Sequence, residues 1–187
     1  MTKLKFSPAS KSSWPQLLEL FGERGACAGC WCMWWRVKRS EWRTGKGAGN
    51  RRALKKIVDS GVAPGILAFD GKRAIGWCSV GPRTEFPGLE RSRTLKPIDD
   101  QPVWSIVCLF VDKDYRRRGV ATALLDAAAK FAKKHGASIV EGYPVIPRKG
   151  EMPDVFAFTG LLSAFEQADY TVVKRPSASR AIVRRIL

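Results

Sequence analysis

The 187-residue sequence is poor in acidic residues and in histidine. It holds one histidine, and 17 acidic residues stand against 33 lysines and arginines, so its formal net charge is +16. No apolar stretch reaches the length of a membrane-spanning helix, and the N-terminal MTKLKFSPAS lacks the apolar run of a signal peptide. The five cysteines are odd in number, which without a secretory signal predicts free thiols in a reducing cytoplasm. Since no linker tract or internal repeat divides the chain, we expect one cytoplasmic domain over residues 1–187.

Two common phosphate-binding motifs are also absent. The P-loop pattern G-x-x-x-x-G-K-[ST] does not occur, and a dinucleotide fingerprint would need three glycines where only Gly119 is present. What stands there is an apolar run, Trp104–Val111, a polar turn, the arginines 116–118 and then an amphipathic pattern over 118–135. This order predicts a buried strand, a basic turn and a helix N-terminus, where free backbone N–H groups favour a bound anion.

The basic turn resembles a family signature. Arg116-x-x-Gly119-x-Ala121 is similar to the [Q/R]-x-x-G-x-[G/A] motif of the GCN5-related N-acetyltransferases (GNAT), whose backbone amides hold the pyrophosphate of acetyl-CoA. The segment 158–170 also resembles the last helix of that family and the strand after it. Two departures are Phe165, where many members carry a tyrosine that can protonate the departing thiolate, and Asp169, which replaces a glycine. The likeness is clearest over 64–187, residues 1–63 form a divergent acceptor-side region, and the chain looks like an uncharacterised bacterial subgroup.

The resemblance implies an α/β (α+β) fold with a mixed, mostly antiparallel sheet and helices on both faces. Two adjacent parallel strands should splay apart, with acetyl-CoA as co-substrate in the gap. Its pantetheine arm would pair with the backbone of the central strand, and an N–H near Leu109 would stabilise the developing oxyanion. The cofactor-binding residues implied are Leu109, Phe110, Val111, Arg116, Arg117, Arg118, Gly119, Val120, Ala121 and Thr122.

A bound amine must lose a proton before it attacks the thioester, so a base or a water chain is needed. Where some family members carry a glutamate on the central strand, this chain has Ser105. The better candidate is Glu141, with Tyr143 on the same face of the next strand. Partial burial would raise the pKa of the Glu141 carboxyl towards neutrality. The alternative is a satisfied structural carboxylate.

The segment 27–35, Cys-Ala-Gly-Cys-Trp-Cys-Met-Trp-Trp, has the most unusual composition. Cys27, Cys30 and Cys32 invite a metal site, but structural zinc needs four ligands and no fourth is evident, so we expect no metal. By the family arrangement this segment lies beside the acceptor pocket. The tryptophans Trp31, Trp34 and Trp35 would then form apolar walls or a cation–π face for an ammonium group. Alternatively they simply pack the core.

The sequence thus predicts an acetyl-CoA-dependent N-acyltransferase, in which a primary amine of a small molecule or protein attacks the thioester directly. The alternative is a non-catalytic CoA-binding or nucleic-acid-binding module on the same fold. The positive charge exceeds what three CoA phosphate groups require, yet it is spread along the chain without an RNA-binding signature. Its dispersion favours a solvated basic surface, so a nucleic-acid partner is unsupported, and no membrane partner is expected.

Turn and capping signals predict the remaining elements. Asn50 should cap a helix, and a two-residue turn, Asp70-Gly71, should close a hairpin. A long polar segment, 81–101, separates that hairpin from the central strand. The other elements expected are strand 4–6, helices 14–21 and 51–60, hairpin strands 66–69 and 74–80, strand 138–143, a helix at about 155–168, and strands near 171–174 and 181–186.

Overall fold

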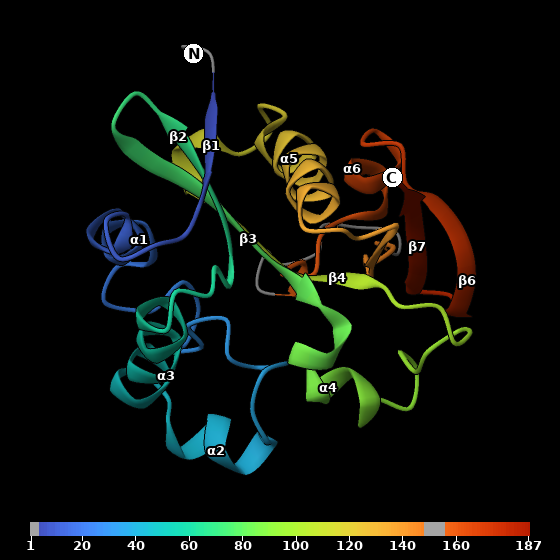
Figure 1. The fold of residues 1–187 in the computed structure, drawn as a ribbon, viewed down its shortest axis with the longest axis horizontal. Coiled ribbons are helices and arrows are strands. Elements are labelled where there is room, and N and C mark those ends of the chain that lie inside the picture. Colours follow the sequence, from blue (N-terminus) through green and yellow to red (C-terminus); the bar gives the residue numbers. More distant parts are fainter. Residues whose placement is uncertain (1–3, 148–155) are drawn as a thin grey trace.

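The computed structural model describes residues 4–147 and 156–187. Within them seven strands form one sheet in the order β1-β2-β3-β4-β5-β7-β6 (Figure 1). Only the β4–β5 pair is parallel in the described chain, which confirms the mixed, mostly antiparallel sheet. The strands are β1 (Lys5–Pro8), β2 (Gly65–Asp70), β3 (Arg73–Pro82), β4 (Trp104–Val111), β5 (Ile139–Gly142), β6 (Thr171–Ser177) and β7 (Arg180–Ile186).

Helices cover both faces of this sheet, as expected. α1 and α3 pack with Trp77 of β3 and Val107 of β4 on one face. α5 and α6 pack with Ile75 of β3 and Ile106 of β4 on the other. No helix in the described ranges is both long and apolar enough to cross a membrane. The helices are α1 (Trp14–Phe21), α2 (Arg39–Thr44), α3 (Ala48–Asp59), α4 (Pro87–Glu90), α5 (Val120–Lys134) and α6 (Leu162–Glu166), with 3-10 turns η1 (Arg83–Glu85) and η2 (Lys113–Tyr115).

The expected cap at Asn50 is wrong. Helix α3 begins at Ala48 with Gly47 as its N-cap, and Asn50 lies in the first turn of the helix. Its side-chain amide instead donates to the carbonyl of Gly29 at 3.1 Å and to that of Trp42 at 3.3 Å. The buried Asn50 side chain therefore does not cap α3 but connects it to the loop around Gly29 and to α2.

Three other expectations need correction. The hairpin turn consists of Gly71 and Lys72, since Asp70 already pairs with Arg73. Two short helices, α2 and α4, form where none was expected. The helix expected at 155–168 begins outside the described residues, and in the described part of that range the α-helical residues are those of α6. Gly160 with φ +89° and the extended N-cap Leu161 delay its start.

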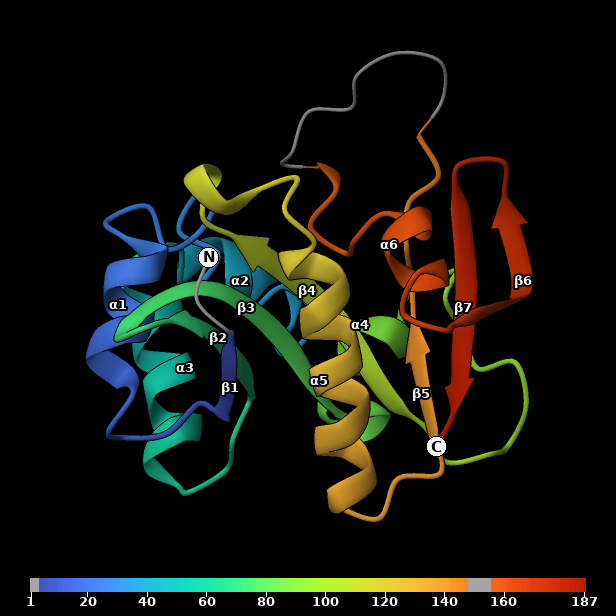
Figure 2. The same cartoon turned by 90° about the horizontal axis from the view of Figure 1, so that it is seen from above.

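The parallel strands β4 and β5 pair only briefly. Their register runs from Trp104 opposite Val140 to Ile106 opposite Gly142. At this point β4 has a bulge, since Ser79 pairs with Cys108 and Val80 with Ile106, which leaves Val107 as an extra residue. Beyond the bulge β4 and β5 run apart, with the first turn of α5 near the far end of β4 (Figure 2). The fold thus provides the splayed pair of strands that the sequence predicted.

Candidate active site

The turn between β4 and α5 has the geometry of an anion-binding loop. Arg117 and Gly119 adopt left-handed φ values of 57° and 76°, and Gly119 is the N-cap of α5. The N–H of Ala123 donates to the Gly119 carbonyl at 3.0 Å, so the N–H groups before it lie ahead of the first bond of the helical ladder. Left-handed residues beside a helix N-terminus form a concave set of N–H donors.

The same loop leaves room for a ligand. A Cβ built on Gly119 would meet no heavy atom within 4 Å. The Arg116 Nε donates to the Val111 carbonyl at 3.1 Å, which holds the turn against the end of β4. The Thr122 hydroxyl donates to the Gln167 side chain at 3.2 Å and so joins α5 to the region after α6. The loop therefore combines positive charge, free donors and open space, which fits the pyrophosphate expected there.

The edge of β4 beyond the bulge is partly occupied. The Leu109 N–H, expected to face the oxyanion, donates to the Phe158 carbonyl at 2.7 Å. Beyond Ile106 the strand has no β5 partner, and both Phe110 and Val111 are half-buried. The Leu109 N–H, which the sequence analysis assigned to the thioester oxygen, is therefore hydrogen-bonded to the Phe158 carbonyl in this structure.

Glu141 of β5 and Tyr143, which directly follows that strand, point to the same side, as period-two alternation predicted. The Tyr143 hydroxyl donates to Glu141 Oε1 at 2.8 Å and lies 2.8 Å from the Ser105 hydroxyl of β4. Glu141 also accepts from the Arg83 guanidinium at 3.2 Å and from Arg184 Nε at 2.8 Å. Its side chain is 1% exposed. Full burial between two arginines replaces the partial burial that was expected, and the contacts match the alternative of a satisfied structural carboxylate.

The surrounding network ties the closed end of the splay together. Arg83 donates to the Tyr143 hydroxyl at 2.7 Å and to the Leu95 carbonyl at 2.6 Å. Burial, together with the nearby charge of Glu141, holds the pKa of Tyr143 well above its usual value, so the phenol stays protonated. A bidentate pair with Asp99 raises the pKa of Arg184. Each buried charge therefore has an opposite partner.

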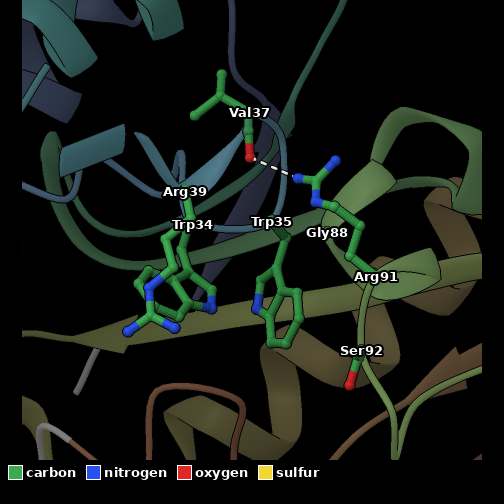
Figure 3. A pocket seen from close by; sticks show the side chains of 7 residues that line it. All are labelled: Trp34, Trp35, Val37, Arg39, Gly88, Arg91 and Ser92. Carbon is green, nitrogen blue, oxygen red and sulfur yellow. Dashed lines mark hydrogen bonds between the residues drawn. The ribbon is translucent and has the colours of Figure 1, made fainter. Parts of the chain in front are cut away.

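The three tryptophans assigned to the acceptor side separate into two groups. Trp31 is buried and stacks on Trp14 with ring centroids 6.3 Å apart, so it packs in the core. Trp34 and Trp35 line a cavity of about 280 Å³ between the loop before α2 and the segment around α4 (Figure 3). The cavity is lined by Trp34, Trp35, Val37, Arg39, Gly88, Arg91 and Ser92.

The clustered cysteines do not converge on one point. No group of three or more His, Cys, Asp or Glu residues in the described ranges is placed to hold a metal ion. Cys32 instead lies with its Sγ 3.1 Å from that of Cys108, at the bulge of β4. Cys30 accepts from the Trp42 indole N–H at 3.3 Å. Cys30 and Cys32, which are close in sequence, thus contact different partners in the structure.

Several residues of this site were missed by the sequence analysis. Arg83, Asp99 and Arg91 lie in or beside the polar segment that was taken for a connection, and Arg184 lies on the last strand. A charged residue in such a segment carries no local signal of its distant partner. The buried Glu141 needed opposite charges, however, and that requirement was the one available clue.

Comparisons with known proteins agree with this geometry. A model of the acetyltransferase (GNAT) family matches residues 27–143, so the match extends into the region expected to diverge. An uncharacterised N-acetyltransferase of Methanocaldococcus jannaschii is 43% identical over 53 residues, which are 28% of this chain and 24% of that protein. Because this relative is archaeal, the expected bacterial subgroup has no support.

Solved structures show the same fold over the whole chain. The PaiA N-acetyltransferase of Thermoplasma acidophilum, in complex with coenzyme A, is 17% identical with a TM-score of 0.53 and full coverage of both chains. A GNAT-family acetyltransferase of Streptococcus agalactiae is 13% identical with a TM-score of 0.58, covering 100% of this chain and 96% of that one.

Proposed function

The chain belongs to the acetyltransferase (GNAT) family, and from this premise we propose that it transfers an acetyl group from acetyl-CoA to an amine. The observation that carries the proposal is the left-handed, basic loop of Arg117 and Gly119 at the start of α5, at the far end of a strand that has left its parallel neighbour. We also propose that residues 1–187 form one domain, because α1 and α3 share a core with β3 and β4.

In this proposal the loop binds the pyrophosphate. The N–H groups of residues 117–122 supply the donors, and the arginines 116–118 add positive charge. The edge of β4 from Leu109 to Val111 pairs with the pantetheine arm, as an added strand would. We propose that the thioester oxygen replaces the Phe158 carbonyl, which lies 2.7 Å from the Leu109 N–H in this structure. The N–H then stabilises the negative charge that develops on this oxygen.

The reaction is a direct displacement. The bound ammonium gives one proton to water, and its neutral nitrogen forms a bond to the carbonyl carbon. The carbon–sulfur bond breaks to release a thiolate, and the nitrogen gives up its second proton to water, which leaves a neutral amide. Phe165 is fully buried and has no hydroxyl, so this position supplies no proton to the thiolate. We propose that Glu141 and Tyr143 are positioning residues. They join β5 to Ser105 of β4 and to Arg83, and so hold the closed end of the splay.

One observation favours the non-catalytic alternative, namely the Phe158 carbonyl on the Leu109 N–H. In a CoA-binding module that bond would persist when the cofactor binds, whereas in an enzyme it must be exchanged. Hydrogen exchange at the Leu109 amide, followed with acetyl-CoA and with desulfo-CoA, distinguishes the two. We expect its protection to depend on the acetylthioester.

The cofactor site is tested by Gly119→Asp, with Gly71→Asp as the matched control. Both glycines have positive φ, 76° and 60°, and both would place a Cβ in open space, but Gly71 lies in the β2–β3 hairpin turn. The backbone strain is therefore similar, and only Gly119→Asp adds a carboxylate to the anion site. We expect calorimetry to show acetyl-CoA binding lost in Gly119→Asp and kept in Gly71→Asp. Near-normal affinity in Gly119→Asp would remove the main support for the proposed function.

A further inference from the structure

The cavity beside Trp34 and Trp35 presents positive charge. The Arg39 guanidinium lies over the Trp34 ring at 5.5 Å, and the Lys46 ammonium lies over the neighbouring Trp42 ring at 4.7 Å. The sequence had suggested that these rings could receive the ammonium group of a substrate. Arg39 already covers the Trp34 ring, so an ammonium group placed on that ring would meet like charge. The cavity is therefore better suited to a negative group.

The described residues that line the cavity carry no negative charge, since none of the seven is acidic. Two neighbouring carboxylates are engaged elsewhere, Glu85 with Arg36 at 2.7 Å and Glu90 with Arg83 at 2.8 Å. Arg39 and Arg91 lie on opposite sides of the two indoles (Figure 3). Both guanidinium groups border the cavity, with Arg39 beside Trp34 and Arg91 turned towards the Val37 carbonyl.

A second observation points to a missing hydrogen-bond acceptor. The indole Nε1 of Trp35 is buried, and it has no hydrogen-bond partner among the described residues. The Trp34 and Trp35 rings lie 6.4 Å apart, and the nitrogen-bearing edges of both turn towards the gap between them (Figure 3). Buried donors are normally satisfied, so an oxygen supplied by a ligand would complete this site.

The cavity walls pack on the same face of the sheet as the residues at the bulge of β4. Trp35 and Leu89 pack in the same cluster as Val107 and Cys108 at the bulge of β4. The Gly88 N–H donates to the Trp35 carbonyl at 2.9 Å, which joins the two walls. A ligand anchored by its anionic end in the cavity would lie over the face on which β4 leaves β5.

We propose that the acceptor is a small amine that carries a carboxylate, bound between Trp34, Trp35, Arg39 and Arg91. This inference rests on the acetyltransferase function proposed above. A single carboxylate suits the site, because Arg91 already uses one guanidinium nitrogen to donate to the Val37 carbonyl at 2.9 Å, which leaves Arg39 as the less engaged guanidinium. The two indole walls favour an apolar body on the same molecule. An amino acid with an aromatic or aliphatic side chain has this chemistry.

The first experiment compares matched amines that differ only in charge. Phenylalanine and leucine are offered with acetyl-CoA beside phenylalaninamide and leucinamide, and the acetylated products are measured by mass spectrometry. Rates are corrected for the fraction of free amine, since the amides have a lower amine pKa. We expect higher kcat/KM for the carboxylates. We expect Arg39→Gln to lower that value about tenfold, as for the loss of a charge-assisted contact. Arg39→Lys should retain part of it, and the exposed Arg52→Gln on α3 is the charge-matched control.

The second experiment needs no turnover. N-acetylphenylalanine and N-acetylphenylalaninamide are titrated into the protein with ¹⁵N-labelled indoles, and we expect only the carboxylate to shift the Trp35 N–H resonance. Two results would overturn the carboxylate inference and leave cofactor binding intact. In the first, the carboxylates and the amides are acetylated equally well. In the second, the protein binds acetyl-CoA but acetylates no member of the panel and shows no indole shift. If the wild-type protein does not bind acetyl-CoA, the acetyltransferase proposal is overturned, and this inference with it.

Discussion

The substitution Glu141→Gln separates a positioning role from a role as general base. The Glu141 carboxylate is 1% exposed and accepts from Arg83, Tyr143 and Arg184. Glutamine keeps the shape but removes the negative charge between two arginines. Breaking a buried ion pair on one side costs about 3–5 kcal/mol. Because Arg83 and Arg184 keep other partners, Glu90 and Asp99, we expect the lower end, about 3 kcal/mol.

In a chain of this length each kcal/mol lowers the melting temperature by about 2–4 °C, so Glu141→Gln should lower it by about 6–12 °C. The matched control is Glu90→Gln, which removes a carboxylate from the same Arg83. Glu90 is 55% exposed, and an exposed pair contributes only about 0–1 kcal/mol. Thermal denaturation of both variants therefore tests whether burial sets the cost.

Turnover tests the catalytic alternative. For a positioning residue we expect kcat of the folded protein to fall by less than about tenfold, with the acidic limb of its pH profile retained, whereas loss of a general base costs about 10²–10⁴-fold. A melting temperature near that of the wild type, with turnover more than a hundredfold lower and no acidic limb, would refute the reasoning and identify Glu141 as the base.

Two further predictions concern the cysteines. Burial raises the pKa of the Cys30 thiol, and the contact with Cys108 together with burial raises the pKa of the Cys32 thiol well above its usual value. We therefore expect iodoacetamide at neutral pH to label half-buried Cys27 first, and to label Cys32 and Cys78 only after unfolding. Peptide mass spectrometry reads the order of labelling. Early labelling of Cys32 would show that the segment opens. We also expect elemental analysis to find no stoichiometric zinc and a chelator to leave the melting temperature unchanged, whereas one zinc per chain would reassign Cys27, Cys30 and Cys32 as ligands.

The parts of the fold that the sequence predicted are those with local signals. The strand of β4, the basic turn and α5 follow from an apolar run, a polar turn and a helical period, all within about thirty residues. The splay of β4 from β5 followed from the family resemblance. The left-handed backbone of Arg117 was not predicted, because in this turn only Gly119 is a residue type that indicates a positive φ.

The parts that it missed depend on partners far apart in the chain. Asparagine is a favoured N-cap residue, but the side-chain amide of Asn50 donates to the carbonyls of Gly29 and Trp42 instead. Trp31 and Trp34 are three residues apart, yet one is buried beside Trp14 and the other lines a cavity. Composition predicts that tryptophans gather there. It does not say which of them faces solvent, because that depends on backbone geometry such as the left-handed φ of 48° at Trp31.

The splay and the buried ion network have a common physical cause. The extra residue Val107 shifts the register of β4, and its pairing with β5 ends after the Ile106–Gly142 register. So short a parallel ladder supplies few backbone hydrogen bonds to hold two strands that must then diverge. Side chains at the closed end supply the rest, through Ser105 with Tyr143 across the pair and through Glu141 to Arg83 on the segment after β3. Buried charge thus fixes the closed end, while β4 has no β5 partner beyond Ile106.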